Sequence, residues 1–445
     1  MKRYLSFISL ILALAACGKI SGDQSFDDPQ GNPGEVPTVS DPITVSSPEP
    51  QAGSIKKISL TLEQQGFSAE SNAFAFRSLA QLYKQSAKSF VFSPLSLQYA
   101  LAMVVNGASG ETAAEITRAL GFGSDLEALN TYCNLLMNQL PALDRNVQIK
   151  LADALVVDNN YPLLSSFEKQ MEQVYYAPVE YMSFRKKSEV VDRINEWAYR
   201  NTNGLIYPFL SEEDLAQAIA VILNALYFKA PWAESIGGNM FLPDFTMAGE
   251  TFYKDGGGTT KVDLMPSTSY FGFAIQNGFR MVEIPYSDGK FAMYVMLPDA
   301  VGKQGLKQLV SAMEKASWKD LRNSFTYTTK VHLRLPKFET ASRFQLAPIL
   351  QALGIRQAFG NGSFDRMFEG KGSFYVSNVL QKARIKVTEW GTEAAAVTAV
   401  MMDGDPGPGA VPPPEADFFC DHPFAYVIAE RSSGTILFEG IFTGE

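Results

Sequence analysis

The sequence predicts an α+β fold, because helical patterns come mainly early in the chain and strand patterns mainly later. Ser71 to Leu82 carries apolar residues at near-helical spacing, and Leu95 to Val105 is apolar on most faces. Val331 to Phe338 instead alternates apolar and polar residues, which is typical of a strand with one wet face. This segregation favours α+β over an alternating α/β arrangement.

The chain begins with a segment typical of an exported protein. Met1 to Arg3 is positively charged and Tyr4 to Ala16 is mostly apolar, so residues 1–16 are interpreted as a signal peptide. The apolar run is shorter than the ~20 residues that a transmembrane helix needs. It ends in Leu-Ala-Ala-Cys-Gly, which resembles a bacterial lipobox and implies that Cys17 becomes the lipidated first residue. The alternative is an ordinary signal peptide with an incidental Cys17.

Residues 17–55 are expected to form a lipidated, disordered tether. From Gly18 to about Ser54 the chain is rich in Pro, Ser, Gly and Asp without hydrophobic periodicity, so it cannot bury enough apolar surface to fold. Flexible-chain scaling gives such a tether a reach of roughly 30 Å. We therefore expect a lipoprotein anchored through Cys17 at the outer membrane or cell surface, with one large domain over residues 56–445.

Composition and charge limit the partners. The formal net charge is −9. It becomes −11 once the signal peptide, here called the leader, is removed with Lys2 and Arg3. Without a basic cluster, this acidic balance argues against nucleic acid as a partner. After lipidation of Cys17, Cys133 and Cys420 remain, and two buried free thiols are favoured over a disulfide. We expect a monomer without a metal or cofactor.

Shorter patterns define individual elements. Ser93-Pro94 indicates a helix start, because serine can cap free amides and proline has no amide hydrogen to lose. Gly107 to Thr112 ends this helix and opens the next. Ala216 to Phe228 is apolar with little alternation, which favours a strand buried on both faces. Further strands are expected at Phe291–Leu297, Phe374–Val387 and Thr435–Phe442, and a helix at Leu346–Leu353 that Gly354 closes.

One small-residue stretch, Gly391 to Val400, is compatible with two local structures. Its alanines favour a helix by intrinsic propensity. With a period of two, the stretch is instead a strand with one face of slim side chains, suited to burial between two existing strands. That face comprises Thr392, Ala394, Ala396, Thr398, Val400 and Met402.

Motifs along the folded part resemble those of the serpin family. They follow the family's order from about Asn72 to Gly440, and together they are far more specific than any one of them. The motifs are Phe92–Ser96, Leu101–Met103, Gly107–Ala113, Ile194–Trp197, Asn224–Trp232, Leu335–Phe338, Leu353–Ile355, Asp421–Phe424 and Gly434–Gly440.

The resemblance implies a large central mixed β-sheet, two smaller sheets, eight to nine helices and an exposed reactive-centre loop at about residues 389–417. It also implies suicide-substrate inhibition. A target protease, the expected partner, attacks the loop and is acylated, and the cut loop then inserts into the main sheet. A new central strand with ~10–20 hydrogen bonds at roughly 0.5–1.5 kcal/mol each would supply on the order of 10 kcal/mol.

By the same resemblance, the inhibitory hinge begins the loop and needs small residues for fast entry. Trp390 departs from the family, whose hinges usually carry a charged residue there, and could slow or alter entry. Trp232 is expected where the loop enters the sheet. Asn224 and His332 are candidates for polar contacts in this loop-entry region, although a satisfied core role is favoured for both. The hinge comprises Glu389, Gly391, Thr392, Glu393, Ala394, Ala395, Ala396, Val397 and Thr398.

The sequence offers several candidates for the scissile bond. The family's spacing from the hinge places the bait residue, which precedes the cut, at Asp405, although the proline that follows makes this a poor cleavage site. Counting back from Pro423 places the bait residue nearer Pro412. No Lys or Arg lies between Lys386 and Arg431, which excludes a trypsin-like target. Elastase-, subtilisin- or chymotrypsin-like serine proteases or papain-like cysteine proteases are expected, and enzymes that cut after Asp are a third class. The candidate scissile region comprises Met401, Met402, Asp403, Gly404, Asp405, Ala410 and Val411.

Two other functions rival protease inhibition. An enzyme is disfavoured, because the chain has only two histidines, His332 and His422, and lacks nucleophile-elbow and Walker motifs. A non-inhibitory surface binding protein with a serpin fold is the stronger rival. Non-inhibitors in the family tend to lose the small hinge residues, whereas this hinge is intact apart from Trp390.

Overall fold

The computed structural model describes residues 7–17, 51–86, 88–235, 238–369, 373–392 and 413–444. In these ranges nine α-helices accompany the strands, as the α+β prediction requires, and no helix is both long and apolar enough to cross a membrane. The helices are α1 (Leu62–Gln85), α2 (Pro94–Gly107), α3 (Gly110–Leu120), α4 (Leu126–Gln139), α5 (Ser165–Tyr175), α6 (Lys187–Asn201), α7 (Lys303–Lys315), α8 (Trp318–Asn323) and α9 (Ala347–Ala352), with short 3₁₀ turns η1 (Pro243–Phe245) and η2 (Gln357–Phe359).

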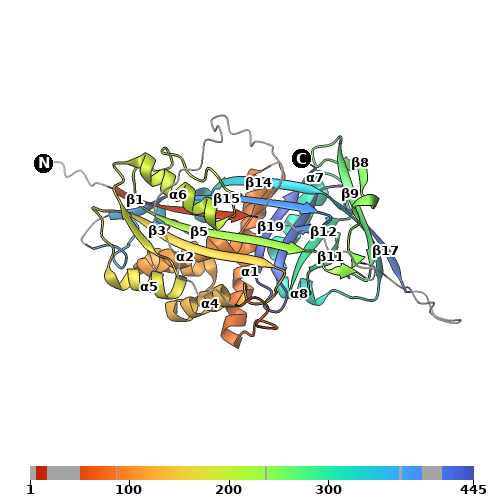
Figure 1. The fold of residues 1–445 in the computed structure, drawn as a ribbon, viewed down its shortest axis with the longest axis horizontal. Helices are drawn as coiled ribbons and strands as arrows, with labels where there is room; N and C mark the ends of the chain where they lie inside the picture. Colours follow the sequence, from red (N-terminus) through yellow and green to blue (C-terminus); the bar gives the residue numbers. More distant parts are fainter. Residues whose placement is uncertain are drawn as a thin grey trace.

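A seven-stranded mixed sheet forms one end of the molecule's long axis and extends toward the middle (Figure 1). Two strands share the space between β15 and β5, here called the central slot. β16 pairs with the carboxyl-terminal ends of both strands, and β1 pairs with their preceding parts. The strands across the sheet are β14 (Phe338–Gln345), β15 (Ser373–Thr388), β1 (Phe7–Cys17), β16 (Gly391–Thr392), β5 (Ala218–Pro231), β3 (Gln148–Asp158) and β4 (Val179–Met182).

Two smaller sheets and a short ribbon complete the described strands. The six-stranded sheet has the order β10 (Gly272–Gln276), β11 (Phe279–Tyr286), β12 (Phe291–Pro298), β18 (Phe424–Glu430), β19 (Ile436–Phe442) and β2 (Phe90–Phe92). The four-stranded sheet has the order β17 (Glu415–Phe419), β13 (Lys330–Pro336), β9 (Thr259–Ser269) and β8 (Met247–Tyr253). The ribbon pairs β6 (Glu234–Ser235) with β7 (Gly238–Asn239).

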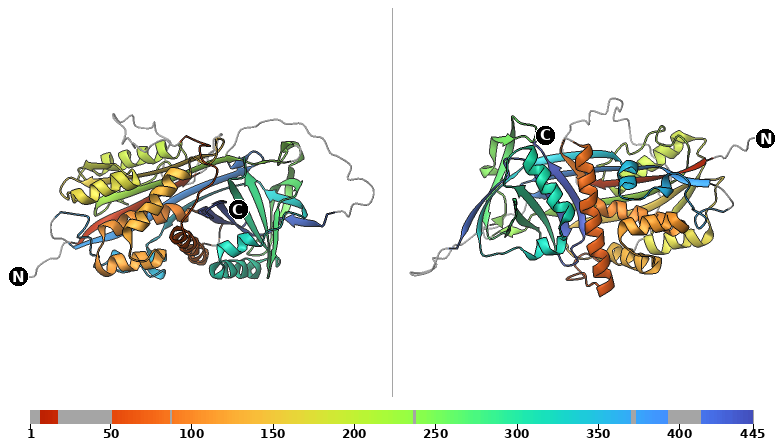
Figure 2. Two further views of the ribbon diagram at one scale, coloured as in Figure 1. Left: turned by 90° about the horizontal axis from the view of Figure 1, so that it is seen from below. Right: turned by 180° about the vertical axis from the view of Figure 1, so that it is seen from behind.

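Helices cover both faces of the large sheet (Figure 2, left). On one face, Trp197 of α6 belongs to a cluster with Ala154 of β3 and Val221 of β5. On the other face, Leu155 and Ile222 belong to the main core together with α2. The prediction of a strand buried on both faces is therefore confirmed for β5.

Most of the remaining element predictions are confirmed. Ser93 caps α2, with its Oγ accepting from Ser96 N at 3.2 Å, and Gly354 follows α9 with a φ of +101°. The predicted strands correspond to β12, β15 and β19. Cys133 and Cys420 are both buried and unpaired.

Two boundaries differ from the prediction. Helix α1 begins well before Ser71, because Thr61 and Gln64 form a capping box at its start. The alternating strand ends at Pro336, and Phe338 already belongs to β14 in another sheet. A regular pattern across two strands does not show where the chain changes sheet, which explains the second error.

The largest difference between the predicted and the observed elements lies in the leader. Phe7–Cys17 forms β1, which runs parallel to both β15 and β5 and pairs with them from Ser9 to Cys17. The facing edges of β15 and β5 offer backbone donors and acceptors to any extended segment. The apolar leader was recognised from the sequence, but its pairing depends on this tertiary context. Most of the predicted tether, residues 18–50, lies outside the described residues.

Candidate functional site

The predicted hinge enters the large sheet at the carboxyl-terminal ends of β15 and β5. The chain leaves β15 at Thr388, turns through Glu389 and Trp390, and returns as β16. Thr392 pairs with Val387 of β15 and with Ala230 of β5, both in antiparallel register. The first residues of the expected loop therefore already lie as a strand in the central slot.

Gly391 is required at this turn on two grounds. Its φ of +134° lies in the region that favours glycine. A Cβ atom there would also lie 2.2 Å from the carbonyl oxygen of Ala230. Any other residue would push the hinge away from the end of β5.

Thr392 is held by an aromatic pair. Its side chain is buried, and its Oγ1 lies 2.6 Å from the hydroxyl of Tyr286. The Tyr286 ring stacks on Trp232, with centroids 4.5 Å apart and an interplanar angle of 6°. Trp232 in turn donates from Nε1 to Thr388 O at 2.8 Å and from its backbone amide to Trp390 O at 3.3 Å. The structure therefore places Trp232 directly against the hinge.

Glu389 ties the same turn to neighbouring sheets. Its carboxylate accepts from Thr246 Oγ1 at 2.8 Å and from Lys337 Nζ at 3.2 Å. Burial alone would raise the pKa of this carboxyl. Hydrogen bonds from its own backbone, Thr246 and Lys337, together with the lysine charge, outweigh burial and lower the pKa below its usual value. Glu389 therefore acts as an anion that fixes the end of β15.

A second polar group lies halfway along the central slot. Asn224 Nδ2 donates to Asp153 Oδ1 at 2.7 Å, and both residues are buried. Burial, only partly offset by this hydrogen bond, raises the pKa of Asp153 to about 7. Across the slot, Gln381 Oε1 accepts from Ser93 N at 2.9 Å, and its Nε2 donates to Ser93 O at 3.0 Å. Asn224 and Gln381 both pair with Leu14 of β1, so they lie opposite each other across the slot.

The structure does not bring Trp232, Asn224 and His332 together, but the core role favoured for Asn224 is confirmed by its burial and its hydrogen bond to Asp153. The same role is wrong for His332, whose side chain is 36% exposed. Asn224 precedes Trp232 by eight residues, which is roughly 26 Å along a strand. His332 lies on β13, where Nδ1 contacts Thr268 Oγ1 at 3.1 Å and Nε2 lies 3.5 Å from Glu415 Oε2. Residue type alone could not place these side chains, because their positions depend on strand register and sheet order.

Several residues of the site were missed from the sequence. Asp153 gave a usable signal, since a lone acid inside an apolar strand must be neutral or specifically paired. Gln381, Tyr286 and Lys337 gave none, because their partners are far away in the chain. Thr246 likewise reaches Glu389 only through the tertiary fold.

The rest of the predicted hinge and scissile region lies outside the described residues. This applies to Glu393, Ala394, Ala395, Ala396, Val397, Thr398, Met401, Met402, Asp403, Gly404, Asp405, Ala410 and Val411. Cys17 is described only as the backbone end of β1.

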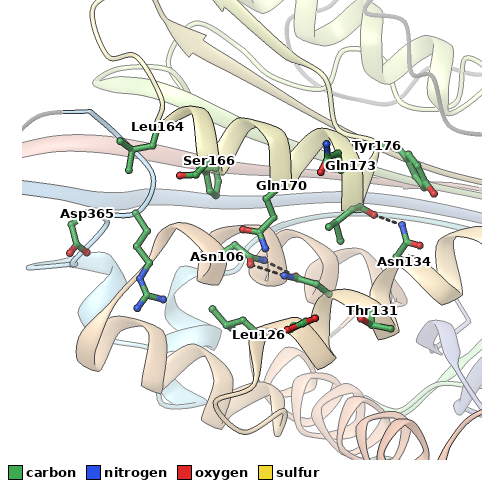
Figure 3. Close-up of a pocket in the computed structure, with 15 residues that line it drawn as sticks. Asn106, Leu126, Thr131, Asn134, Leu164, Ser166, Gln170, Gln173, Tyr176 and Asp365 are labelled. Atoms are coloured by element: carbon green, nitrogen blue, oxygen red, sulfur yellow. Dashed lines mark hydrogen bonds between the residues drawn. The ribbon is translucent and has the colours of Figure 1, made fainter.

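A cavity of about 810 Å³ lies between α4 and α5, away from the hinge (Figure 3). Among its lining residues, Asn106 and Asn130 exchange two hydrogen bonds of 2.9 Å, and Asn134 donates to Val174 O at 2.7 Å. These amides are satisfied by hydrogen bonds within the chain, and the described hinge residues, Glu389, Gly391 and Thr392, do not line the cavity. We assign this cavity no part in loop insertion.

Comparisons with known proteins agree with this geometry. The family model described as Serpin (serine protease inhibitor) matches residues 69–443. Serpin-Z2B of Triticum aestivum is 31% identical over 392 residues, which cover 84% of this chain and 94% of that protein.

Solved structures give the same picture. Serpin48 of the insect Tenebrio molitor, a highly specific serpin, has a TM-score of 0.75 and 28% identity, over 86% of this chain and 99% of that chain. Cleaved Serpin 42Da has a TM-score of 0.74 and 25% identity, with the same two coverages. This chain belongs to the Serpin (serine protease inhibitor) family.

Proposed function

We propose that this protein traps proteases by inserting its cut reactive-centre loop into the large sheet. The observation that carries the proposal is β16. Gly391 and Thr392 already pair with both edges of the central slot, so insertion needs only to continue a strand that has begun. The protease acylated by the loop would be carried along before its ester is hydrolysed.

The slot provides the driving force for this movement. A strand inserted along it would form ~10–20 hydrogen bonds with β15 and β5, worth on the order of 10 kcal/mol. This is comparable to the whole stability of a typical domain, about 5–15 kcal/mol. The small residues predicted for the entering face would pass the buried Asn224–Asp153 and Gln381–Ser93 pairs with little steric resistance.

In this proposal the leader must leave the slot first. β1 pairs with the same stretches of β15 and β5 that the loop would use. Removal of residues 1–16, lipidation of Cys17 and tethering to an outer membrane or cell surface would leave the sheet free for the loop. Mass spectrometry of the mature amino terminus tests this step. A lipidated Cys17 in the membrane fraction is expected, and Cys17→Ser should abolish it.

The proposed targets are elastase-, subtilisin- or chymotrypsin-like serine proteases, or papain-like cysteine proteases. The experiment incubates the chain from residue 18 with one protease of each type and assays SDS-resistant complexes. At least one stable complex is expected. If every protease cuts the loop cleanly and none is trapped, inhibition is rejected and the non-inhibitory alternative takes its place.

Thr392→Arg tests the hinge assignment. Arginine would put a charge at a side chain that is 1% exposed and remove the contact with Tyr286. We expect the variant to be cut but not to trap protease, whereas Thr392→Ser, which keeps the hydroxyl, should still trap it. Unchanged trapping by the arginine variant would reject the buried position of this side chain in the mechanism.

A further inference from the structure

A second cavity, of about 660 Å³, opens beside the hinge. Its walls come from the segment before β3, the end of β5, the β6–β7 ribbon, the β11–β12 turn and the β15–β16 turn. Trp390, the residue that departs from the family pattern, is among the lining residues. Trp390 therefore belongs both to the hinge turn and to the wall of this cavity.

Apolar side chains form one wall of this cavity. This wall is formed by Trp232 and Pro231 from the end of β5, together with the buried side chain of Met240. Tyr286 stacks behind Trp232 and fixes its ring plane. Trp390 is half-buried, and its carbonyl accepts from the Trp232 amide at 3.3 Å. Two indole side chains are therefore held beside one cavity by a direct backbone contact, an arrangement that suits a planar aromatic ring.

The rim offers a free cation. Arg145 is exposed, and its guanidinium has no hydrogen bond or ion pair among the described residues. Two of the lining carboxylates are already occupied: Glu389 contacts Lys337 at 3.2 Å, and Asp288 contacts Lys290 at 3.4 Å. Glu234 is exposed on the ribbon, and its negative charge competes with a bound carboxylate for Arg145. A guanidinium fork matches a carboxylate in shape and charge.

We propose that this cavity binds a planar aromatic carboxylate, with its ring against Trp232 and Trp390 and its carboxylate on Arg145. The bound ring would hold the β15–β16 turn against the end of β5, so that β16 stays paired in the central slot. The binding site stands independently, whereas this effect on loop entry rests on the proposed inhibitory function.

Isothermal titration calorimetry of the full chain with naphthalene-2-carboxylate tests the site. We expect one saturable site with a Kd on the order of 0.1–1 mM, which corresponds to about −5 kcal/mol. Arg145→Gln should weaken binding by about tenfold, the equivalent of ~1.4 kcal/mol, and Trp390→Ala should also weaken it. Arg118→Gln is the matched control, because Arg118 lies on α3 outside the cavity lining and is also exposed. It should bind like the unmodified chain.

Neutral and cationic probes complete the test. Naphthalene-2-carboxamide should bind at least tenfold more weakly than the carboxylate. Equal affinity of Arg145→Gln, stronger binding of 2-naphthylmethylammonium, or no saturable binding up to ~10 mM would each overturn the site. These readouts use no protease, so binding without any trapped complex would reject the proposed inhibition and leave the site standing.

The effect on loop entry has its own measurement. If a trapped complex forms with the chain from residue 18, saturating naphthalene-2-carboxylate should raise the fraction of its loop cleavage events that end in trapping by about twofold. The same ligand should have no effect on Arg145→Gln. An unchanged trapping fraction despite proven binding would reject the link between cavity and hinge.

Discussion

Glu389 directly follows β15, and its carboxylate accepts hydrogen bonds from Thr246 Oγ1 and Lys337 Nζ. Thr246 precedes a strand of the four-stranded sheet, and Lys337 connects that sheet to β14. One side chain therefore joins the hinge turn to two other parts of the fold. Since its pKa is lowered by these contacts, their loss should loosen the turn.

Glu389→Gln should lower the melting temperature by about 1–2 °C, because a partly buried ion pair is worth roughly 1 kcal/mol. In a Lys337→Met background the same substitution should have less effect, because the charge partner is already absent. Differential scanning calorimetry of the four proteins gives the coupling. Strictly additive effects would contradict a direct interaction.

Asp153 makes the sheet sensitive to pH. Its pKa is about 7 in the folded chain and about 3.9 when unfolded, so the folded state binds a proton more readily. The stability that this proton gives is complete below about pH 4 and is lost as the pH rises to about 7. Asp153→Asn should therefore stabilise the protein more at pH 8 than at pH 5, by roughly 2–3 kcal/mol.

Thermal unfolding at both pH values measures this difference. Asp244→Asn is the control, because Asp244 is exposed in η1, and its effect should be small at both pH values. A stabilisation by Asp153→Asn that does not change between pH 5 and pH 8 would contradict an ionising Asp153 inside the sheet.

Single residues differed in how well the sequence predicted them. Ser93 could be recognised, because a cap acts on the amide three residues later. Gly391 was predicted as a hinge residue, although its close approach to the carbonyl oxygen of Ala230 could not be predicted. The Asp153–Asn224 pair joins residues 71 positions apart, and only the register of β3 against β5 brings them together.

At the scale of elements, β1 and β16 occupy successive parts of one slot. β16 is antiparallel to β15 and β5, whereas β1 is parallel to both. The strands that border the slot were predicted correctly, because their apolar patterns reflect permanent burial. The use of the leader as a strand was not predicted, because it depends on unpaired edges formed elsewhere in the chain.

Removal of the leader should change the response to loop cleavage. In the chain from residue 18, cleavage within residues 393–412 should raise the melting temperature by about 10 °C, from ~10 kcal/mol of added hydrogen bonding over a domain of this size. In the full chain the rise should be much smaller, because β1 already fills the slot. Calorimetry of both chains before and after limited subtilisin digestion measures it, and equal rises would contradict competition for the slot.

At the scale of the whole molecule, the family, the α+β class and the three main sheets all followed from the sequence. Motifs spread over the chain carried this prediction, because each records a local requirement of the same fold. The scissile bond did not follow, since the spacing counted from the hinge gives Asp405 and the spacing counted back from Pro423 gives Pro412. One negative conclusion still applies to the entire loop.

Trypsin should neither be inhibited nor cut the chain between Lys386 and Arg431, because no Lys or Arg lies between them. Peptide mass mapping after digestion and assay of residual trypsin activity check this expectation. Met402→Arg supplies the missing residue and should create a trypsin cleavage site in the loop. Cleavage of the unmodified chain inside this interval would contradict the exclusion.

The slot has a property that follows from its two borders. Because β15 and β5 run in the same direction, their facing edges can bond to a strand of either polarity, and β1 and β16 realise both cases. Hydrogen bonding therefore does not distinguish one occupant from another. Selection must rest on side-chain size at the level of Asn224 and Gln381, and on which segment is covalently close enough to arrive first.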